Sequence, residues 1–153
     1  MAVFTHQVTM RWSDVNAYGV ASDTAIASYV EETRAALIRK VVTATTVRES
    51  ADYFAYLTVR QRIDYLMPVR WQEQPLELDL RVLLIRPAAT ELCVRLASEG
   101  HPVAEARILS TCWDTARNRP RLLNNEQREF LSQYLVPESR TSAAAPDSLE
   151  RAR

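Results

Sequence analysis

The sequence has no long uninterrupted run of hydrophobic residues. Its apolar stretches are broken every few residues by arginine, aspartate or glutamate, whereas a helix needs roughly 20 consecutive apolar residues to span a bilayer. The segment Met1–Met10 also lacks the basic region, apolar core and small-residue cleavage site of a secretory signal. We therefore predict a protein without a membrane span that works in the cytoplasm.

The chain also lacks net charge, because its 19 basic and 19 acidic residues cancel. Proteins that bind nucleic acid or an anionic membrane through a broad electric field carry an excess of basic residues. We therefore expect neither of these partners. Any anionic ligand must instead be met by a local cluster of positive side chains.

Cysteine and histidine are scarce, with two of each among 153 residues. Cys93 and Cys112 lie in alternating segments without C-x-x-C spacing, which predicts buried, reduced thiols rather than a disulfide framework or a zinc site. His6 and His101 stand far apart in the sequence, which argues against a histidine-based metal site. We therefore predict neither a metal nor a cofactor.

What is present is the composition of one soluble globular domain. Hydrophobic residues make up 47% of the chain and charged residues 25%, the balance of an ordinary folded protein. A chain of this length is expected to form one core. We predict one domain over residues 1–135, followed by a disordered tail over residues 136–153, which is small, polar and interrupted by proline.

One long helix is predicted from Asp23 to about Lys40, where apolar residues recur with a period of 3.6. Ser22 or Asp23 can cap its first amides, and Arg39 with Lys40 can complement the negative end of its dipole. The apolar stripe consists of Ile26, Tyr29, Val30, Thr33 and Leu37, while Glu31, Glu32, Arg34 and Arg39 are expected to face elsewhere.

Five segments alternate apolar and polar residues as half-buried strands do. In the first segment, Val8, Met10 and Trp12 are predicted to share one face. In the third, every second residue from Leu76 to Leu84 is predicted to be buried. The five segments are Phe4–Ser13, Tyr56–Leu66, Leu76–Arg86, Thr90–Ser98 and Val103–Asp114.

Two further segments complete the expected order of elements. Val41–Phe54 has no clear period and is interpreted as a connection, and Asn124 or Asn125 can cap a final helix that carries Phe130, Leu131 and Tyr134. One strand, one long helix and then four strands that can form a meander indicate an α+β fold, with the helix packed on one face of an antiparallel sheet.

The loop between the first strand and the long helix carries the most specific motif. The stretch RWSDVNAYGVASDTAIASYVEETRAAL, Arg11–Leu37, resembles without a gap the opening of the 4-hydroxybenzoyl-CoA thioesterase branch of hotdog-fold proteins, written R-x-S-D-x-D-A-x-G-H-V-N-N-x-x-Y-x-x-Y-x-E-E-A-R. Further on, VRQRIDYLMPVRWQEQPLELDLRV resembles the family's second strand, turn and third strand. The resemblance implies a hotdog fold, in which a sheet of about five strands wraps around one central helix.

The same resemblance implies a function and a site. It implies an acyl-CoA thioesterase that hydrolyses an aromatic or fatty acyl-CoA between the subunits of a homodimer or homotetramer. The backbone N–H of about Asp23 would polarise the thioester carbonyl, and Gly19, one of only two glycines, would let the loop approach it. We expect substrate-binding roles for Gly19, Val20, Ser22, Tyr29, Arg60 and Arg62. Arg60, Arg62, Arg70 and Arg86 are the candidates to meet CoA phosphates, and Tyr18, Tyr65 and Trp71 are expected to line the core or an acyl pocket.

The sequence departs from the family motif where the catalytic carboxylate is expected. The second Asp of the family's D-x-D is Asn16 here, and an amide cannot accept the proton that a carboxylate accepts. Val20 replaces the motif histidine, and Ser22 and Asp23 replace its two asparagines. Asn16 can still orient water or bind the carbonyl through its N–H donors.

Three other carboxylates are candidates to replace the missing one. Asp23 lies at the helix start and could also serve as its N-cap; Glu32 could have a structural or interface role; Asp14 could instead stabilise the loop. The predicted function is acyl-CoA hydrolysis that uses Asn16, Asp23, Asp14 or Glu32. The alternative is a noncatalytic or weakly catalytic hotdog protein that binds acyl-CoA or a related ligand.

Overall fold

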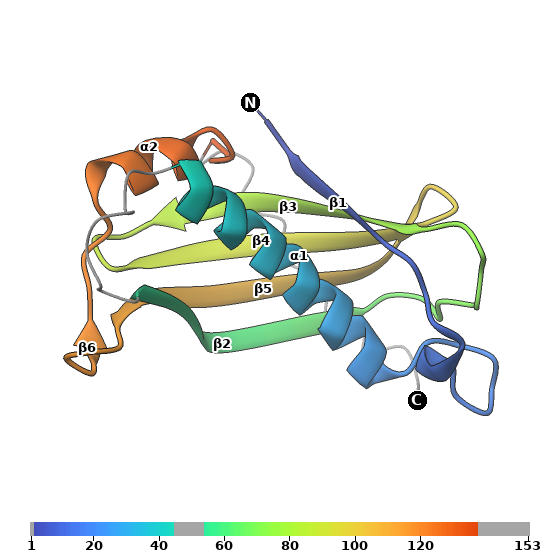
Figure 1. Ribbon diagram of the computed structural model, residues 1–153. Helices are drawn as coiled ribbons and strands as arrows, with labels where there is room; N and C mark the ends of the chain where they lie inside the picture. Colours follow the sequence, from blue (N-terminus) through green and yellow to red (C-terminus); the bar gives the residue numbers. More distant parts are fainter. Residues whose placement is uncertain (1, 45–53, 138–153) are drawn as a thin grey trace, which may run out of the picture.

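The computed structural model describes residues 2–44 and 54–137, so part of the predicted 41–54 connection and nearly all of the predicted tail lie outside the described residues. The fold consists of one layer of antiparallel strands with the long helix packed across it (Figure 1). The elements are β1 (Phe4–Val8), a 3-10 helix (Trp12–Asp14), α1 (Asp23–Ala44), β2 (Phe54–Tyr65), β3 (Leu76–Ile85), β4 (Ala89–Ser98), β5 (His101–Asp114), β6 (Arg119–Pro120) and α2 (Asn125–Ser132).

The sheet confirms the predicted α+β class but not the predicted meander. Its order is β1-β3-β4-β5-β2, with the two-residue β6 paired to the end of β5, and every pairing is antiparallel. Among the five long strands, only β3, β4 and β5 are neighbours in both the chain and the sheet, and tight turns join them. β2 pairs with β5 instead of β3, so it lies at the far edge of the sheet.

Helix α1 buries the predicted apolar stripe, in which Tyr29, Val30 and Leu37 are each 1% exposed. Two expectations about this helix are wrong. Arg34 is buried, because its guanidinium donates to the Glu31 carboxylate and to the Tyr56 carbonyl at 3.1 Å. The helix also continues to Ala44, so no basic residue lies in its last turn.

In two strands, the predicted row of buried side chains is shorter than expected. β1 stops at Val8, and Trp12 stands in the 3-10 helix, 74% exposed, where it packs edge-on to Trp71 with ring centroids 5.3 Å apart. In β3, a register shift between Val82 and Leu84 reverses the alternation, because one extra residue turns the next side chain to the other face. Leu84 is consequently 39% exposed.

The two edges of the sheet differ. The β3 edge is covered by β1 and by the chain after α2, where the Val82 amide donates to the Tyr134 carbonyl at 3.0 Å and the Val136 amide to the Val82 carbonyl at 2.9 Å. Among the described residues, β2 pairs only with β5, and Leu57 and Val59 are 43% and 60% exposed. The fold therefore leaves one unpaired edge with exposed apolar side chains.

Candidate active site at the start of the long helix

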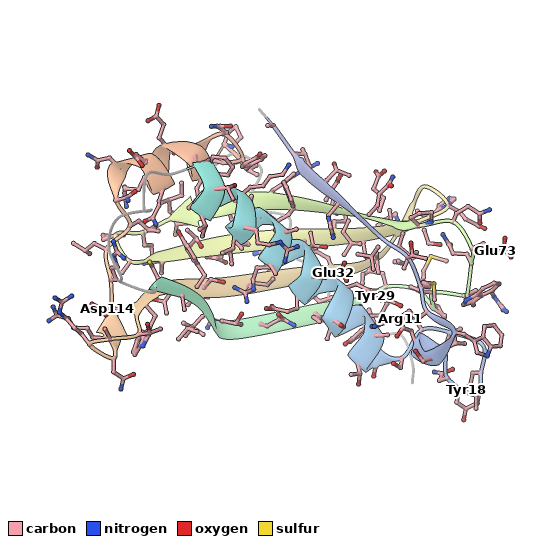
Figure 2. All side chains as sticks on the ribbon, in the orientation of Figure 1. Arg11, Tyr18, Tyr29, Glu32, Glu73 and Asp114 are labelled. Carbon is pink, nitrogen blue, oxygen red and sulfur yellow. The ribbon has the colours of Figure 1, made fainter. Side chains whose placement is uncertain are left out.

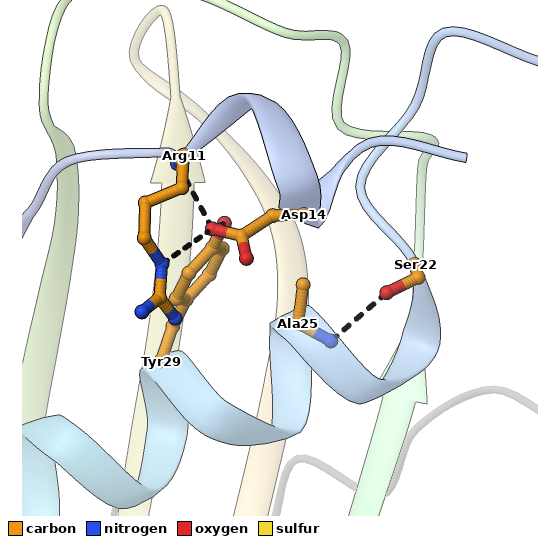
Figure 3. A network of polar contacts seen from close by, with 5 residues as sticks. All are labelled: Arg11, Asp14, Ser22, Ala25 and Tyr29. Atoms are coloured by element: carbon orange, nitrogen blue, oxygen red, sulfur yellow. Dashed lines mark hydrogen bonds and ion pairs between the residues drawn. The ribbon is translucent and has the colours of Figure 1, made fainter. Parts of the chain in front are cut away.

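The loop before α1 is held by a buried carboxylate, Asp14 (Figure 3). Its Oδ2 accepts hydrogen bonds from the Tyr29 hydroxyl at 2.7 Å and from the Arg11 amide at 2.9 Å, and the Arg11 side chain lies 3.5 Å away. Burial by itself raises the pKa of Asp14, but these bonds and the Arg11 charge outweigh it and the pKa is lowered. Asp14 therefore anchors the loop to the helix.

The turn at residues 16–20 is organised by the Asn16 side chain. Its Oδ1 accepts from the amides of Tyr18 at 2.9 Å and Val20 at 3.4 Å. Gly19 has a φ of 76°, which confirms the predicted turn conformation that favours glycine. Because its oxygen is occupied by backbone amides, Asn16 can offer a ligand only its N–H donors.

The first turn of α1 has both capped and uncapped amides. Ser22 is the N-cap, since its Oγ accepts from the Ala25 amide at 3.1 Å and its carbonyl from the Ile26 amide at 3.0 Å. Asp23 is thus the first helical residue and not the cap. Within residues 2–44 and 54–137, no acceptor is bonded to the amides of Asp23 and Thr24, so these two donors remain available at the positive end of the helix dipole.

A cleft of about 320 Å³ opens beside this turn; we call it the Asp23 cleft. Asn16 and Asp23 supply its polar side chains from the loop and the helix, and Ile26 lies one helical turn deeper. Its opposite wall is the apolar segment 65–69, together with Val103 and Ala104 of β5. The cleft therefore has the polar side chains of Asn16 and Asp23 at the end beside the first helical turn, the Tyr65 hydroxyl on the facing wall, and otherwise hydrophobic walls.

The two walls are tied together by backbone bonds. The Ala21 amide donates to the Val69 carbonyl at 2.8 Å, and the Trp71 amide to the Gly19 carbonyl at 3.4 Å. The Leu66 and Met67 amides both donate to the Val103 carbonyl, at 2.9 and 3.2 Å. The loop of the motif, the segment after β2 and the start of β5 consequently form one structural unit around the cleft.

Tyr65 belongs to this unit and lies in the electric field of Asp23. Partial burial is the main cause that raises the pKa of the Tyr65 hydroxyl, and the negative charge of Asp23 is the second. Half of the Tyr65 side chain is exposed. The predicted pocket-lining role of Tyr65 agrees with this position.

Several predicted site residues lie elsewhere. Tyr29 is buried in the core, where burial and the bond to Asp14 raise the pKa of its hydroxyl. Glu32 is nine residues after Asp23, roughly 14 Å along the helix, near the middle of α1 (Figure 2). Its carboxylate contacts the His6 ring at 3.5 Å. Arg60 and Arg62 point to the face of the sheet opposite Tyr65, because strand side chains alternate, and Arg62 pairs with Asp64 at 3.0 Å.

Three of the site residues predicted from the sequence, Asn16, Val20 and Asp23, line the cleft. The wall formed by residues 66–69 was not predicted. Its signal in the sequence is the apolar pair Leu66 and Met67 directly before Pro68, because proline is disfavoured inside a strand. Leu66 and Met67 are 52% and 56% exposed. Exposed apolar side chains around a cleft are a feature of ligand sites.

The described residues contain no group of three or more potential metal-ligating side chains and no helix long and apolar enough to cross a membrane. Cys93 and Cys112 are free thiols, as predicted. Cys112 is buried, but Cys93 is only half-buried. Burial raises the pKa of the Cys93 thiol to about 11, which leaves it protonated and unreactive at neutral pH.

Several solved structures similar to this chain are named as thioesterases. A predicted thioesterase from Bacillus stearothermophilus superposes with a TM-score of 0.76 at 18% identity, covering 88% of this chain and 98% of that one. A thioesterase from Thermus thermophilus, complexed with coenzyme A and Zn, gives 0.68 at 19% identity, with coverages of 84% and 96%. A 1,4-dihydroxy-2-naphthoyl-CoA thioesterase from Synechocystis gives 0.70 at 15%, with coverages of 86% and 96%.

These superpositions confirm the predicted hotdog fold. No curated protein matches the sequence closely enough to count as a relative. The model of the thioesterase-like superfamily, however, matches residues 10–148, which include the Asn16 loop, the long helix and the whole sheet after β1. The chain therefore belongs to the thioesterase-like superfamily.

Proposed function

We propose that this protein hydrolyses acyl-CoA thioesters in the Asp23 cleft. The observation that carries the proposal is the meeting of a carboxylate and two available amide donors in the first turn of α1, at the polar end of an apolar cleft. Thioester hydrolysis needs both kinds of group, one to activate water and the other to stabilise the oxyanion. Membership of the thioesterase-like superfamily agrees with this chemistry.

The amides of Asp23 and Thr24 would hold the thioester carbonyl. As water attacks, negative charge develops on the carbonyl oxygen, and the two N–H donors and the helix dipole stabilise it. The removal of one such donor typically costs about 10²- to 10³-fold in kcat. Because these amides belong to a helix whose other first-turn donors are already capped, they are held in place before the substrate arrives.

The Asp23 carboxylate would serve as the general base. It accepts a proton from water as the water oxygen bonds to the carbonyl carbon, forming a tetrahedral intermediate. The carbon–sulfur bond then breaks, and the CoA thiolate takes up the proton, leaving a free thiol and a carboxylic acid. Asp23 lines the cleft and its side chain is exposed, so water can reach it.

Asn16 would position the substrate and not take the proton. The Asn16 oxygen already accepts two backbone amides, and its N–H₂ group is the end that a ligand can use. An amide donor next to a carbonyl or an attacking water can orient either one. The function lost with the family's motif aspartate would thus be divided between Asn16, which orients, and Asp23, which accepts the proton.

The walls of the cleft favour an apolar acyl group. Ile26, Leu66, Met67 and Val69 surround the space beyond the polar end, and apolar walls select substrates by the hydrophobic surface that they bury. We propose an aromatic or fatty acyl group carried on CoA. Two structurally similar proteins are described in complex with CoA, from Thermus thermophilus and Staphylococcus aureus.

We further propose a homodimer, or a homotetramer built from such dimers, joined through the unpaired edge of β2. This edge exposes Leu57 and Val59 and has no strand next to it among the described residues. Two copies of an exposed edge strand can pair antiparallel about a twofold axis, which satisfies their free backbone groups. The Asp23 cleft lies at the end of β2 and would then border the partner subunit.

One observation favours a second function, the binding of an acyl-CoA without hydrolysis. Asn16 stands at the motif carboxylate position, and its oxygen is occupied by the turn. Against this alternative, the cleft contains the Asp23 carboxylate beside the amide donors. The two functions differ in a measurable product, the free CoA thiol.

The experiment is a thiol-release assay across a panel of aromatic and aliphatic acyl-CoAs, with the native protein and Asn16→Asp. The proposal expects turnover by the native protein and a preference for an apolar acyl group. A native protein that binds acyl-CoA but releases no thiol, and that gains turnover in Asn16→Asp, would establish the binding function instead.

A further inference from the structure

The Asp23 cleft has no basic residue in its lining, although the CoA that we propose as its ligand carries several negative charges. Asp23 is the only charged residue among those that line the cleft, and it is negative. Of the arginines expected to meet the phosphates, Arg60 and Arg62 point to the opposite face of the sheet, whereas Arg70 is exposed beside the cleft and forms a β-bridge with Val20. The lining itself thus supplies no positive charge, and one arginine beside it is few for a ligand with several phosphate charges.

A second cleft, of about 400 Å³, lies at the other end of the sheet and is rich in arginine. We call it the arginine cleft. Its lining includes Arg117, Arg119 and Arg121 from the β5–β6 hairpin, together with the buried Asp114. Asp114 pairs with Arg117 at 3.0 Å, and the Arg119 side chain is exposed. Clustered guanidinium groups favour phosphate ligands, which they bind through forked hydrogen bonds.

Within one chain the two clefts are too far apart to share a ligand across the sheet. β2 has 12 residues and runs from Phe54, opposite Asp114, to Tyr65 at the Asp23 cleft, a length of roughly 35 Å. Figures 1 and 2 show β6 and Asp114 at one end of the molecule, and the start of α1 and Tyr18 at the other. The arginine cleft of a chain consequently cannot serve its own Asp23 cleft.

Antiparallel pairing of two β2 edges would bring the arginine cleft of one subunit to the same end of the sheet as the Asp23 cleft of the other. It sets the Phe54 end of one subunit beside the Tyr65 end of the other. From the β2 edge inward, the strands at the Phe54 end are β2, β5 and β6, as the pairs Phe54–Asp114 and Asp114–Arg119 show. At about 4.8 Å per strand, Arg119 of the partner would lie roughly 15 Å from Tyr65 across the continuous sheet.

The arginines also lie on the required face. In β5, Ala104 and Asp114 both point to the buried side that faces α1, and Arg119 and Arg121 stand opposite Asp114 and Cys112 on the same side. Directly opposed residues of an antiparallel pair project from the same face. A twofold axis perpendicular to the sheet preserves that face, so the partner's arginines and the Asp23 cleft would open on the same side of the dimer.

We propose that the arginine cleft of each subunit binds the phosphate groups of the acyl-CoA whose thioester lies in the Asp23 cleft of the partner subunit. This inference rests on the proposed acyl-CoA ligand and β2-edge dimer. The ligand chemistry is a nucleotide phosphate joined by the pantetheine arm to the reacting thioester. The arginine cleft thereby supplies the local positive cluster that a chain without net charge needs for an anionic substrate.

The test compares acyl-CoA with the corresponding acyl-pantetheine, which has the same thioester and no phosphate. In Arg119→Ser, the KM for acyl-CoA is expected to rise about tenfold or more, the effect of one charge-assisted hydrogen bond, while kcat and the KM for acyl-pantetheine stay unchanged. Arg95→Ser removes the same charge from the other face of the sheet and is the control, expected to match the native protein. Equal changes for both substrates, or no change for either, overturn the proposal.

A hybrid dimer distinguishes a partner's arginines from a chain's own. One chain carries Asp23→Asn and the other Arg119→Ser with Arg121→Ser, and the hybrid is purified with two affinity tags. Its only intact Asp23 cleft belongs to the arginine-deficient chain and faces a partner with native arginines. A native KM for acyl-CoA supports the proposal, and a KM as high as that of the Arg119→Ser/Arg121→Ser homodimer overturns it.

A calorimetric titration with CoA and with pantetheine tests the same site without catalysis. Weaker CoA binding to Arg119→Ser than to the native protein, with unchanged pantetheine binding, supports the phosphate site even if no thioester is hydrolysed. That combination would show that the arginine cleft binds the CoA phosphates even though the proposed hydrolase activity is absent. Equal CoA affinity in the native protein and Arg119→Ser overturns the arginine cleft, whether or not thioesters are hydrolysed.

Discussion

At the scale of single residues, the site assigns different tasks to carboxylates that look equivalent in the sequence. Asp14 is buried and accepts hydrogen bonds from Tyr29 and the Arg11 amide, which leaves it a structural role. Glu32 contacts His6 on the exposed side of α1. Asp23 alone among the predicted catalytic carboxylates lines the cleft.

The substitution Asn16→Asp tests the proposed roles of Asn16, which orients the substrate, and Asp23, which accepts the proton. The introduced carboxylate would keep an oxygen for the amides of Tyr18 and Val20, so the turn should hold. It would also join Asp23 as a second carboxylate in the cleft, restoring the base of the family motif. We expect kcat for acyl-CoA to rise about 10-fold or more, within the range of general-base effects. Asn16→Ser is the neutral control, and steady-state kinetics that show no difference between the two variants would contradict the assignment.

Removal of the Tyr29 hydroxyl tests the anchor of the loop. Tyr29→Phe deletes a 2.7 Å hydrogen bond to a buried carboxylate, which should lower the free energy of unfolding by about 1–3 kcal/mol. Chemical denaturation at pH 7 measures this loss. Tyr18→Phe, at a side chain that is 87% exposed, is the control and should leave the free energy of unfolding unchanged.

The same anchor makes stability depend on pH. The pKa of Asp14 is lower in the folded protein than its ordinary value of 3.8, so its bonds stabilise the fold fully only above that value, and this contribution disappears as the pH falls through the lowered native pKa. Denaturation midpoints measured from about pH 6 down to about pH 2.5 should therefore fall more steeply for the native protein than for Tyr29→Phe. Parallel curves would contradict this role of Asp14.

At the scale of elements, the start of α1 is the proposed catalytic element, and the extent and contacts of this helix were predicted only in part. The helix start at Asp23, the buried stripe and a cap by Ser22 follow from periodicity and from the chemistry of capping. The burial of Arg34 does not, because it depends on the Tyr56 carbonyl of β2, which is distant in sequence. Contacts of this kind require the strand order, and local patterns do not contain it.

The strand order itself shows the same limit. Alternation located β3, β4 and β5 within a residue or two, since each buries one face. It could not show that β2 crosses to the far edge beside β5, or that residues 66–69 fold over the helix start. The loop motif identified Asn16, Val20 and Asp23, but the opposite wall of the cleft depends on bonds to Val103 that no local pattern contains.

The oxyanion donors can be tested by removing one amide from the helix. Thr24→Pro deletes an N–H that has no acceptor among the described residues, in the first helical turn, where proline is tolerated. We expect kcat to fall about 10²- to 10³-fold. Thr24→Ala keeps the amide and is the control. Thermal unfolding should show that both variants fold, and equal kcat values for Thr24→Pro and Thr24→Ala would exclude this amide from catalysis.

At the scale of the whole molecule, the proposed activity depends on how two copies meet. One edge of the sheet is covered by β1 and by residues 134–136, and the other is the unpaired edge of β2, at least within residues 2–44 and 54–137. A protein with one such edge, on which Leu57 and Val59 are exposed and whose strand ends at the Asp23 cleft, is suited to isologous pairing.

Charge placed on this edge should separate the subunits. In Leu57→Lys with Val59→Lys, two positive side chains from each subunit would meet like charges across the twofold axis. Analytical ultracentrifugation should then show a folded monomer where the native protein sediments as a dimer or tetramer, and the KM for acyl-CoA should rise. Leu84→Lys, at a side chain that is 39% exposed on β3, away from the β2 edge, is the control. A native protein that sediments as a monomer would contradict the proposed dimer.

The proposed hydrolase depends above all on Asp23, which activates water for attack on the thioester at the start of the long helix. The most direct measurement is the steady-state rate of thiol release from the preferred acyl-CoA by the native protein and by Asp23→Asn, an isosteric change that removes only the base. We expect a kcat lower by about 10²- to 10⁴-fold in Asp23→Asn, with a similar affinity for CoA. Equal rates in the two proteins, or no turnover by the native protein, would show that Asp23 is not the base of a thioesterase.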